Sequence, residues 1–372
     1  MTARSHLSDL PTNIASYYPC HFPLINLQMK QRMGSALLSL WPNAQFYSVP
    51  ALFIELGTPT PALTWFHPTH FFHERIDLFQ LSEVETAGFE AGLHQLRSRI
   101  SCGEIPMITG TVYELPYSPD YHNPLYLEPL IGGGMRSALQ DISQFFIADH
   151  YVAVINITDD GVTLYDPIPH QFIGTISLDI LERFWRGNHQ FGAFIGARGY
   201  DNLTSYGFLD VLLAEEYQDD TLDDLARSIL ANVSTTFLSG VTKQTTRRHY
   251  FSGVALNAYI QHYFSSHYAE TGEAPKTLGK SIFDMRWSHY FLRDFIHDLC
   301  DTLDLPLMSE RTEVDAIVQQ WEQLYTLFFR ITRKTFAVRD EQAQHFCTML
   351  EDISATERCF HEKLLNKLQD KI

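Results

Sequence analysis

The sequence contains few cysteines and few positive charges, and each shortage excludes a class of protein. The five cysteines are scattered and none has CxxC spacing, which indicates a reducing compartment and argues against a disulfide framework. Lys and Arg together number 27 against 44 Asp and Glu, which gives a formal net charge of −17. A surface with this charge is unsuited to general nucleic-acid binding or to an anionic membrane surface, because both require clustered cations.

Long apolar runs are also missing. No stretch approaches the roughly 18 uninterrupted apolar residues of a membrane span. The first ten residues are polar and lack the apolar centre of a signal peptide. Internal repeats and low-complexity tracts are absent as well. These features predict a soluble cytoplasmic protein.

The residues that are abundant predict a folded protein with two domains. Hydrophobic residues make up 45% of the 372 residues and aromatic residues 13%, which is typical of a packed globular chain. Before residue 200, short apolar runs predict buried strands at 51–54, 107–112 and 151–157. Helical spacing predicts helices at 20–33, 83–100 and 178–185 between and after them. We therefore expect an α+β domain with an antiparallel sheet over residues 1–200.

Beyond residue 200 the apolar spacing becomes helical almost throughout. We expect an all-α domain over residues 201–372, which forms a wall or lid of the substrate pocket. Its last helix is expected at about 342–368, and its clearest loop at 268–280. The stripes that predict the earlier helices are Leu209, Leu212 and Leu213; Leu222, Leu225, Ile229 and Val233; and Val314, Ile317, Trp321, Leu324, Phe328 and Ile331.

The most informative segment is 149–167, which has the pattern of a β-hairpin. His150 begins an apolar strand, Asp160-Gly161 forms a turn signal, and a second strand ends at Asp166. An Asp-Gly pair between two apolar runs strongly favours a hairpin. His150 and Asp166 are then expected on adjacent antiparallel strands near one end of the sheet, where a side-chain hydrogen bond is feasible.

Cys20 lies just before the first predicted helix and can complete a catalytic set with these two residues. A helix N-terminus and a nearby imidazolium both lower the pKa of a thiol, and the thiolate is the nucleophile. His150 would act as base toward Cys20 and later as acid toward the leaving group. Asp166 would hold the His150 ring in the required tautomer.

Each of these residues also has a purely structural interpretation. Cys20 can be a small core residue, because cysteine is often buried without reactivity. His150 can be a core histidine bonded to a backbone carbonyl. Asp166, followed by Pro167, can end a strand or begin a turn. Only their mutual distance distinguishes these interpretations from a catalytic one.

Two segments resemble a known family. The hairpin resembles the His/Asp part of papain-like enzymes, which include the double-glycine leader peptidases. The preceding segment 103–122, which contains Leu115-Pro116-Tyr117, resembles the butirosin biosynthesis protein H family. That resemblance implies a papain-like first domain and a helical second region. It assigns Cys20 as nucleophile, His150 as base and Asp166 as the residue that orients His150.

The resemblance also implies a reaction. It points to a cysteine acyltransferase, or amide synthase, of natural-product and antibiotic biosynthesis. The enzyme would take an acyl group from a carrier-protein thioester through an acyl-Cys20 intermediate and pass it to an amine. The donor arm would be the 4′-phosphopantetheine of an acyl or peptidyl carrier protein, with no cofactor bound directly. We expect substrate contacts from Tyr117, Gly133 and Tyr151.

Charge predicts the remaining partners. The densest basic cluster contains Lys243, Arg247 and Arg248 and would attract an acidic carrier protein, although it equally fits a solvated helix end or loop. The overall negative charge would suit a cationic acceptor such as a polyamine or aminosugar. The residues Gly132-Gly133-Gly134 can form either a flexible loop or a backbone nest for the pantetheine phosphate.

Other functions remain open on the sequence alone. The same three residues would serve a peptidase, amidase or thioesterase, and without catalysis the chain would be a scaffold that binds a carrier protein. We expect no metal, because Pro68 and the spacing of His67, His70 and His73 do not fit one helix face. Asn13 and Gln28 are candidate oxyanion donors only by their proximity to Cys20 in the sequence.

Overall fold

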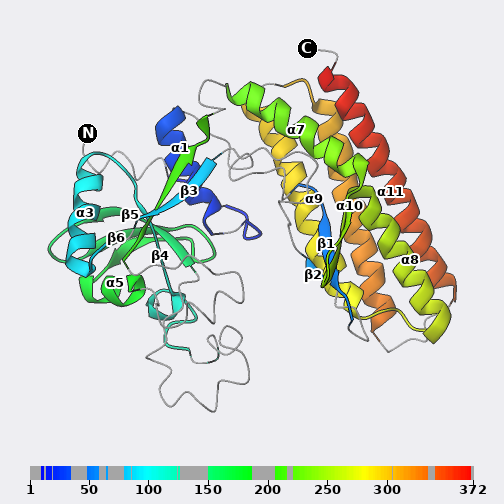
Figure 1. Cartoon of the computed structure of the whole chain (residues 1–372), viewed down its shortest axis with the longest axis horizontal. Coiled ribbons are helices and arrows are strands. Elements are labelled where there is room, and N and C mark those ends of the chain that lie inside the picture. Colours follow the sequence, from blue (N-terminus) through cyan, green and yellow to red (C-terminus); the bar gives the residue numbers. More distant parts are fainter. Residues whose placement is uncertain are drawn as a thin grey trace. The chain divides into compact units, whose positions relative to one another are not determined.

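The computed structural model, shown in Figure 1, describes most of the chain as helices and strands. The described residues are 10–11, 14–18, 20–34, 48–57, 64–65, 79–84, 86–123, 125, 150–186, 206–215, 221–303, 305–333 and 340–369. They fall into two compact units. Unit 1 comprises Met1–Trp41 and Phe79–Ala214, and unit 2 comprises Pro42–Leu78 and Glu215–Ile372. The observed division therefore differs from a single boundary at residue 200, because the segment Pro42–Leu78 belongs with the C-terminal unit.

Unit 1 is built on a six-stranded antiparallel sheet. Its strand order is β3-β8-β4-β5-β6-β7. The strands are β3 (Phe79–Val84), β4 (Met107–Gly110), β5 (His150–Ile157), β6 (Val162–Asp166), β7 (Phe172–Ile176) and β8 (Phe208–Leu213). The helices are α1 (Phe22–Met33), α3 (Phe89–Ser101) and α5 (Leu178–Trp185), with the short 3₁₀ helix η4 (Val112–Glu114) after β4. This confirms the predicted α+β class with an antiparallel sheet.

The core of unit 1 lies where α3 and α5 pack against the sheet. Its fully buried members come from α3, the central strands and α5, including Leu96, Val152, Leu164, Leu181 and Trp185. This core fixes the central strands, since Val152 and Val154 of β5 and Val162 and Leu164 of β6 are anchored in it. The ends of these two strands are consequently held in fixed positions.

One helix predicted in the second domain is in fact a strand of unit 1. Leu209, Leu212 and Leu213 have helical spacing in the sequence, but they lie in β8, which pairs with both β3 and β4. Leu209 is buried while Leu212 is 44% exposed, so these leucines do not share one buried face. The apolar run is only six residues long, a length at which strand and helix patterns are hard to distinguish and pairing decides.

Unit 2 is mostly helical but is not all-α as predicted. Its helices are α7 (Leu222–Ser239), α8 (Gly253–Thr271), α9 (Thr277–Thr302), α10 (Met308–Thr332) and α11 (Asp340–Gln369). It also contains an antiparallel sheet of order β2-β1-β10-β9, formed by β1 (Ala51–Glu55), β2 (Thr64–Trp65), β9 (Thr242–Gln244) and β10 (Arg248–Ser252). Strand β1 pairs with β10 across about 200 residues of chain, which local periodicity cannot predict.

A single buried carboxylate connects four helices of unit 2. Glu357 of α11 is 1% exposed. It accepts hydrogen bonds from Asn257 of α8 at 2.7 Å and from Trp321 of α10 at 2.8 Å, and His289 Nε2 of α9 lies 2.6 Å from it. A buried carboxylate with three partners specifies one arrangement of the helices that contribute them. Among the helices in the described part of the chain, none has the length and apolar character needed to cross a bilayer.

Because His361 on the same helix α11 is buried, we expect acid to lower the stability of unit 2. Its ring stacks on Phe237 of α7 at 4.2 Å, and its Nδ1 lies 3.1 Å from Ser234 Oγ. Burial, together with the charge of nearby His289, lowers the pKa of His361 to about 3. The unfolded chain takes up a proton below about pH 6.5, whereas folded His361 does not. As the pH is lowered below about 6.5, the free energy of unfolding should therefore decrease, by up to about 1.4 kcal/mol per pH unit.

This expectation is checked by urea unfolding of the full chain, followed by circular dichroism between pH 7.5 and 5. The variant His361→Gln should flatten the slope below pH 6.5, because it removes the titrating ring. The exposed His345 on α11 provides the matched control, and His345→Gln should leave the slope unchanged. Equal slopes in wild type and His361→Gln would contradict the assignment.

Candidate active site

The strands β5 and β6 form the predicted hairpin and bring His150 and Asp166 together. The register pairs Ala153 with Tyr165, so Asp166 lies opposite Val152 and on the same face of the sheet as His150. His150 Nε2 lies 2.8 Å from Asp166 Oδ2. His150 is 3% exposed and Asp166 is fully buried. A buried carboxylate against one ring nitrogen fixes the orientation of the imidazole and leaves Nδ1 for another partner.

Asp166 has a second partner in Tyr117. The Tyr117 hydroxyl donates a hydrogen bond to Asp166 Oδ2 at 3.0 Å. The Tyr117 ring stacks on Phe172 of β7, with centroids 3.6 Å apart. Burial, and then the charge of Asp166 and their hydrogen bond, raise the pKa of Tyr117 far above its usual value, so the hydroxyl remains a donor. Tyr117, which we expected to contact substrate, therefore contacts the residue behind the histidine.

Cys20 lies two residues before the first turn of α1. The helix carries proline within its first two positions and ends at Gly34, which adopts φ 78° as a left-handed cap. Its residues Phe22, Ile25 and Met29 are almost completely buried, so α1 is fixed within unit 1. The thiol thus stands beside the N-terminal end of a rigid helix, where the partial positive charge favours an anion.

The environment of Cys20 favours the thiolate. Burial opposes ionisation, but hydrogen bonds with His150 and His21 and the charges of both rings outweigh it and lower the pKa of Cys20 to about 6. The same contacts act in reverse on His150. Burial opposes its protonation, whereas hydrogen bonds and charges of Asp166 and Cys20 raise the pKa of His150 to about 10. Between these values the favoured state pairs a thiolate with an imidazolium.

His170 is a neighbour of this arrangement that the sequence analysis did not single out. Its Nε2 lies 4.0 Å from Asp166 Oδ2, and its ring meets that of His150 edge-on at 5.4 Å. Burial lowers the pKa of His170, which favours the neutral ring. A neutral His170 does not compete with His150 for an ion pair with Asp166. Within the described residues, His170 Nε2 and Asp166 Oδ1 have no hydrogen-bond partner. The only sequence signal is a histidine four residues after the aspartate.

The same three side chains have the composition of a metal site. Ligand atoms of His150, Asp166 and His170 all lie within 4.8 Å of one another. Two imidazoles and a carboxylate suit several divalent metals. However, His150 Nε2 and Asp166 Oδ2 already face each other at 2.8 Å, and Tyr117 donates to the same oxygen. A metal would have to replace both contacts, so the observed geometry fits a proton-transfer site better. The run from His67 to His73 lies outside the described residues.

No family model matches this chain, and no curated protein is significantly similar to it. The assignment of a function therefore depends on the geometry of the site.

The other expected substrate contacts are placed differently. Tyr151 follows His150 on β5. Its ring packs against that of His21, the residue that follows Cys20, with centroids 5.4 Å apart. Gly133 lies outside the described residues. Asn13 also lies outside them. Gln28 is not an oxyanion donor, because its side chain bonds to the backbone of Ile105, Leu209 and Val211 and joins α1 to the sheet region.

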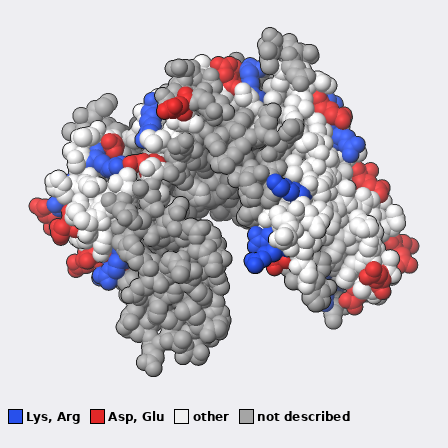
Figure 2. All heavy atoms as spheres, viewed as in Figure 1, with Lys and Arg blue, Asp and Glu red and all other residues white. Residues whose placement is uncertain are grey.

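The predicted carrier-binding cluster lies in unit 2, on the hairpin of β9 and β10. Lys243 belongs to β9, Arg247 to the turn and Arg248 to β10. A guanidinium nitrogen of Arg248 lies 3.5 Å from Glu55 Oε1. The guanidinium carbon lies 4.3 Å from the centroid of the Phe53 ring. On the face drawn in Figure 2, by contrast, acidic side chains are frequent along α11. The hairpin thus offers a local concentration of cations on a chain of net negative charge.

Proposed function

We propose that this chain is a papain-like cysteine acyltransferase that forms an amide from a thioester. The observation that carries the proposal is the coupling of three groups. The Cys20 thiol has its pKa lowered to about 6 by His150 and His21, and His150 is in turn held by buried Asp166. A thiolate next to a protonated, oriented imidazole is what covalent acyl transfer requires.

In the proposed first step, the Cys20 thiolate attacks the thioester carbonyl. The tetrahedral intermediate collapses and expels the donor thiolate, which receives the proton of His150. In the second step an amine attacks the acyl-Cys20 carbonyl, and neutral His150 accepts a proton from the amine nitrogen. Collapse then releases the amide and restores the Cys20 thiolate. The balance is thioester plus amine giving amide plus thiol, and no redox partner is needed.

The sequence supplies the substrate class. Leu115-Pro116-Tyr117 and the hairpin resemble the butirosin biosynthesis protein H family, which implies a carrier protein as acyl donor. Its 4′-phosphopantetheine arm would deliver the thioester. The cluster of Lys243, Arg247 and Arg248 is the surface we propose for the acidic carrier. A polyamine or aminosugar fits as acceptor, because the net charge of −17 attracts cations.

The proposal is tested by offering the full-length chain an acyl-pantetheine thioester, with and without spermidine or an aminosugar. Intact-protein mass spectrometry should show one acyl adduct, mapped to Cys20, and the amine should convert it to an amide. If free acid forms at the same rate with and without amine, the chain is a thioesterase or amidase. If no adduct forms with any thioester while Cys20 remains reactive to alkylation, acyl transfer is wrong.

A chelator separates the proposal from metal chemistry at the same residues. Acyl-adduct formation should be unchanged after dialysis against EDTA. Loss of adduct formation on chelation, with recovery on adding Zn²⁺, would instead assign His150, Asp166 and His170 to a metal.

A further inference from the structure

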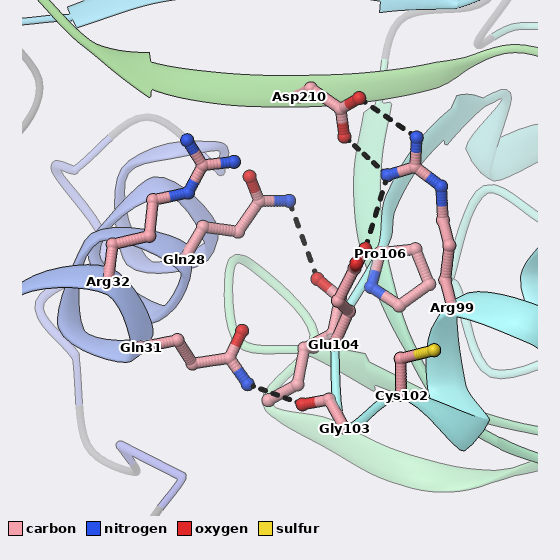
Figure 3. A pocket seen from close by; sticks show the side chains of 10 residues that line it. Gln28, Gln31, Arg32, Arg99, Cys102, Gly103, Glu104, Pro106 and Asp210 are labelled. Atoms are coloured by element: carbon pink, nitrogen blue, oxygen red, sulfur yellow. Dashed lines mark hydrogen bonds and ion pairs between the residues drawn. The ribbon is translucent and has the colours of Figure 1, made fainter.

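A polar cavity of unit 1 lies along the C-terminal half of α1. It measures about 460 Å³ and is lined by Gln28, Gln31, Arg32, Arg99, Cys102, Gly103, Glu104, Ile105, Pro106 and Asp210. Its walls are α1, the end of α3 with the following loop, and β8 (Figure 3). Gln28 lies about 9 Å of helix rise beyond Phe22, the first residue of α1, and Cys20 precedes that residue, so the cavity is distinct from the proposed active site.

Part of the lining is already satisfied by internal bonds. Arg99 binds both carboxylate oxygens of Asp210, at 2.5 and 2.9 Å. A bidentate pair of this kind is geometrically saturated and forms a fixed wall. The Gln28 amide makes three backbone contacts, and Gln31 Nε2 donates to Gly103 O at 3.1 Å. These groups shape the cavity but have little capacity left for a ligand.

Two charged side chains in the lining can still form most of their hydrogen bonds and ion pairs with a ligand. Arg32 makes no hydrogen bond or ion pair with any described residue, and Figure 3 shows its guanidinium extending from α1 into the space that the other lining residues face. Glu104 has a side chain that is 55% exposed and has only a long contact of 3.5 Å with Arg99. Gln31 Oε1 adds a neutral acceptor to the lining, since only the Nε2 end of that amide is bonded.

We propose that this cavity binds a small zwitterion of the amino-acid class. The carboxylate would bind the Arg32 guanidinium, which presents a planar fork of donors suited to it. The ammonium group would bind the Glu104 carboxylate and Gln31 Oε1. The four charges of the lining, Arg32, Arg99, Glu104 and Asp210, sum to zero, so a ligand with one charge of each sign suits the site better than a simple anion or cation. The volume accommodates one amino acid.

The test uses the full-length protein and the twenty standard L-amino acids, first by thermal shift and then by calorimetry. The best ligand should lose affinity when its carboxylate is converted to the amide or its amine is acetylated. Arg32→Gln and Glu104→Gln should each weaken binding by about tenfold or more, because each removes a charge-assisted contact. Arg97→Gln and Glu90→Gln are matched controls on exposed positions of α3 outside the lining, and both should bind as wild type.

Three results would overturn the proposal. One is the absence of binding by any amino acid at millimolar concentration. Another is binding that survives both Arg32→Gln and Glu104→Gln. The third is equally tight binding of acetate or inorganic phosphate, which would make the cavity a plain anion site. All these measurements are independent of the chemistry of Cys20, so they succeed or fail separately from the proposed acyl transfer.

Discussion

Replacing Cys20 by alanine is expected to abolish both the acyl adduct and amide formation. Turnover should fall by about 10³-fold or more, because removal of a nucleophile eliminates the covalent route and leaves only positioning effects. The variant should fold normally, since alanine fits where a half-buried cysteine was. The matched control is Cys359→Ala, which removes an exposed free cysteine and should leave turnover unchanged.

The same cysteine should show a distinctive alkylation profile. The rate of reaction of Cys20 with iodoacetamide should rise with a midpoint near pH 6, because the thiolate is the reacting form and the pKa is lowered to about 6. An ordinary exposed thiol titrates near pH 8.5. Labelling at pH 6.5, followed by peptide mapping, should therefore be concentrated on Cys20. A midpoint near 8.5 would contradict the thiolate assignment, and an acyl adduct that persists in Cys20→Ala would refute the nucleophile.

Replacing Asp166 by asparagine is expected to lower kcat/KM by about 10² to 10⁴-fold. Asparagine has nearly the same shape but no charge, so it neither supports the imidazolium nor selects the required tautomer. Asp166 acts through His150 and is a positioning residue. Because its hydrogen bond and charge help raise the pKa of His150 to about 10, its neutralisation should lower that pKa. The Cys20 alkylation midpoint should then rise, since the cation that stabilises the thiolate is weakened.

Tyr117→Phe is the graded comparison for this effect. It removes the hydroxyl that donates to Asp166 but preserves the ring that stacks on Phe172. A lost neutral hydrogen bond contributes about 1 kcal/mol, so the expected decrease in kcat/KM is about tenfold or less. If Asp166→Asn reduces thermal stability while the pH profile of Cys20 stays as in wild type, Asp166 has only a structural role.

The parts of the fold and site that the sequence could predict are those with local signals. The Asp160-Gly161 turn between two apolar runs is enough to predict β5, β6 and the pairing of His150 with Asp166. The helix α1 after Cys20 follows from apolar residues and an early proline. In each case the residues that interact are brought together by one turn or one helix.

The remaining contacts depend on residues far apart in the chain. The bond from Tyr117 to Asp166 spans 49 positions, and Gln28 reaches Leu209 across 181. The pattern at Leu209, Leu212 and Leu213 fitted a helix because a six-residue run carries too little periodicity to exclude one. Strands β9 and β10 were not recognised, since their partner β1 lies near the start of the chain. No local pattern records such pairings.

The pairing of β1 with β10 has a consequence for how the polypeptide is made. Unit 1 is interrupted by Pro42–Leu78, and the sheet of unit 2 combines that segment with residues from beyond position 240. During synthesis, β1 leaves the ribosome long before its partner exists, and unit 1 lacks β8 until residue 213 is added. A gene cut at residue 200 would separate β8 from its sheet and β1 from β10. Because the coding segments of the two units alternate along the gene, a single recombination crossover cannot exchange one unit without also dividing the other.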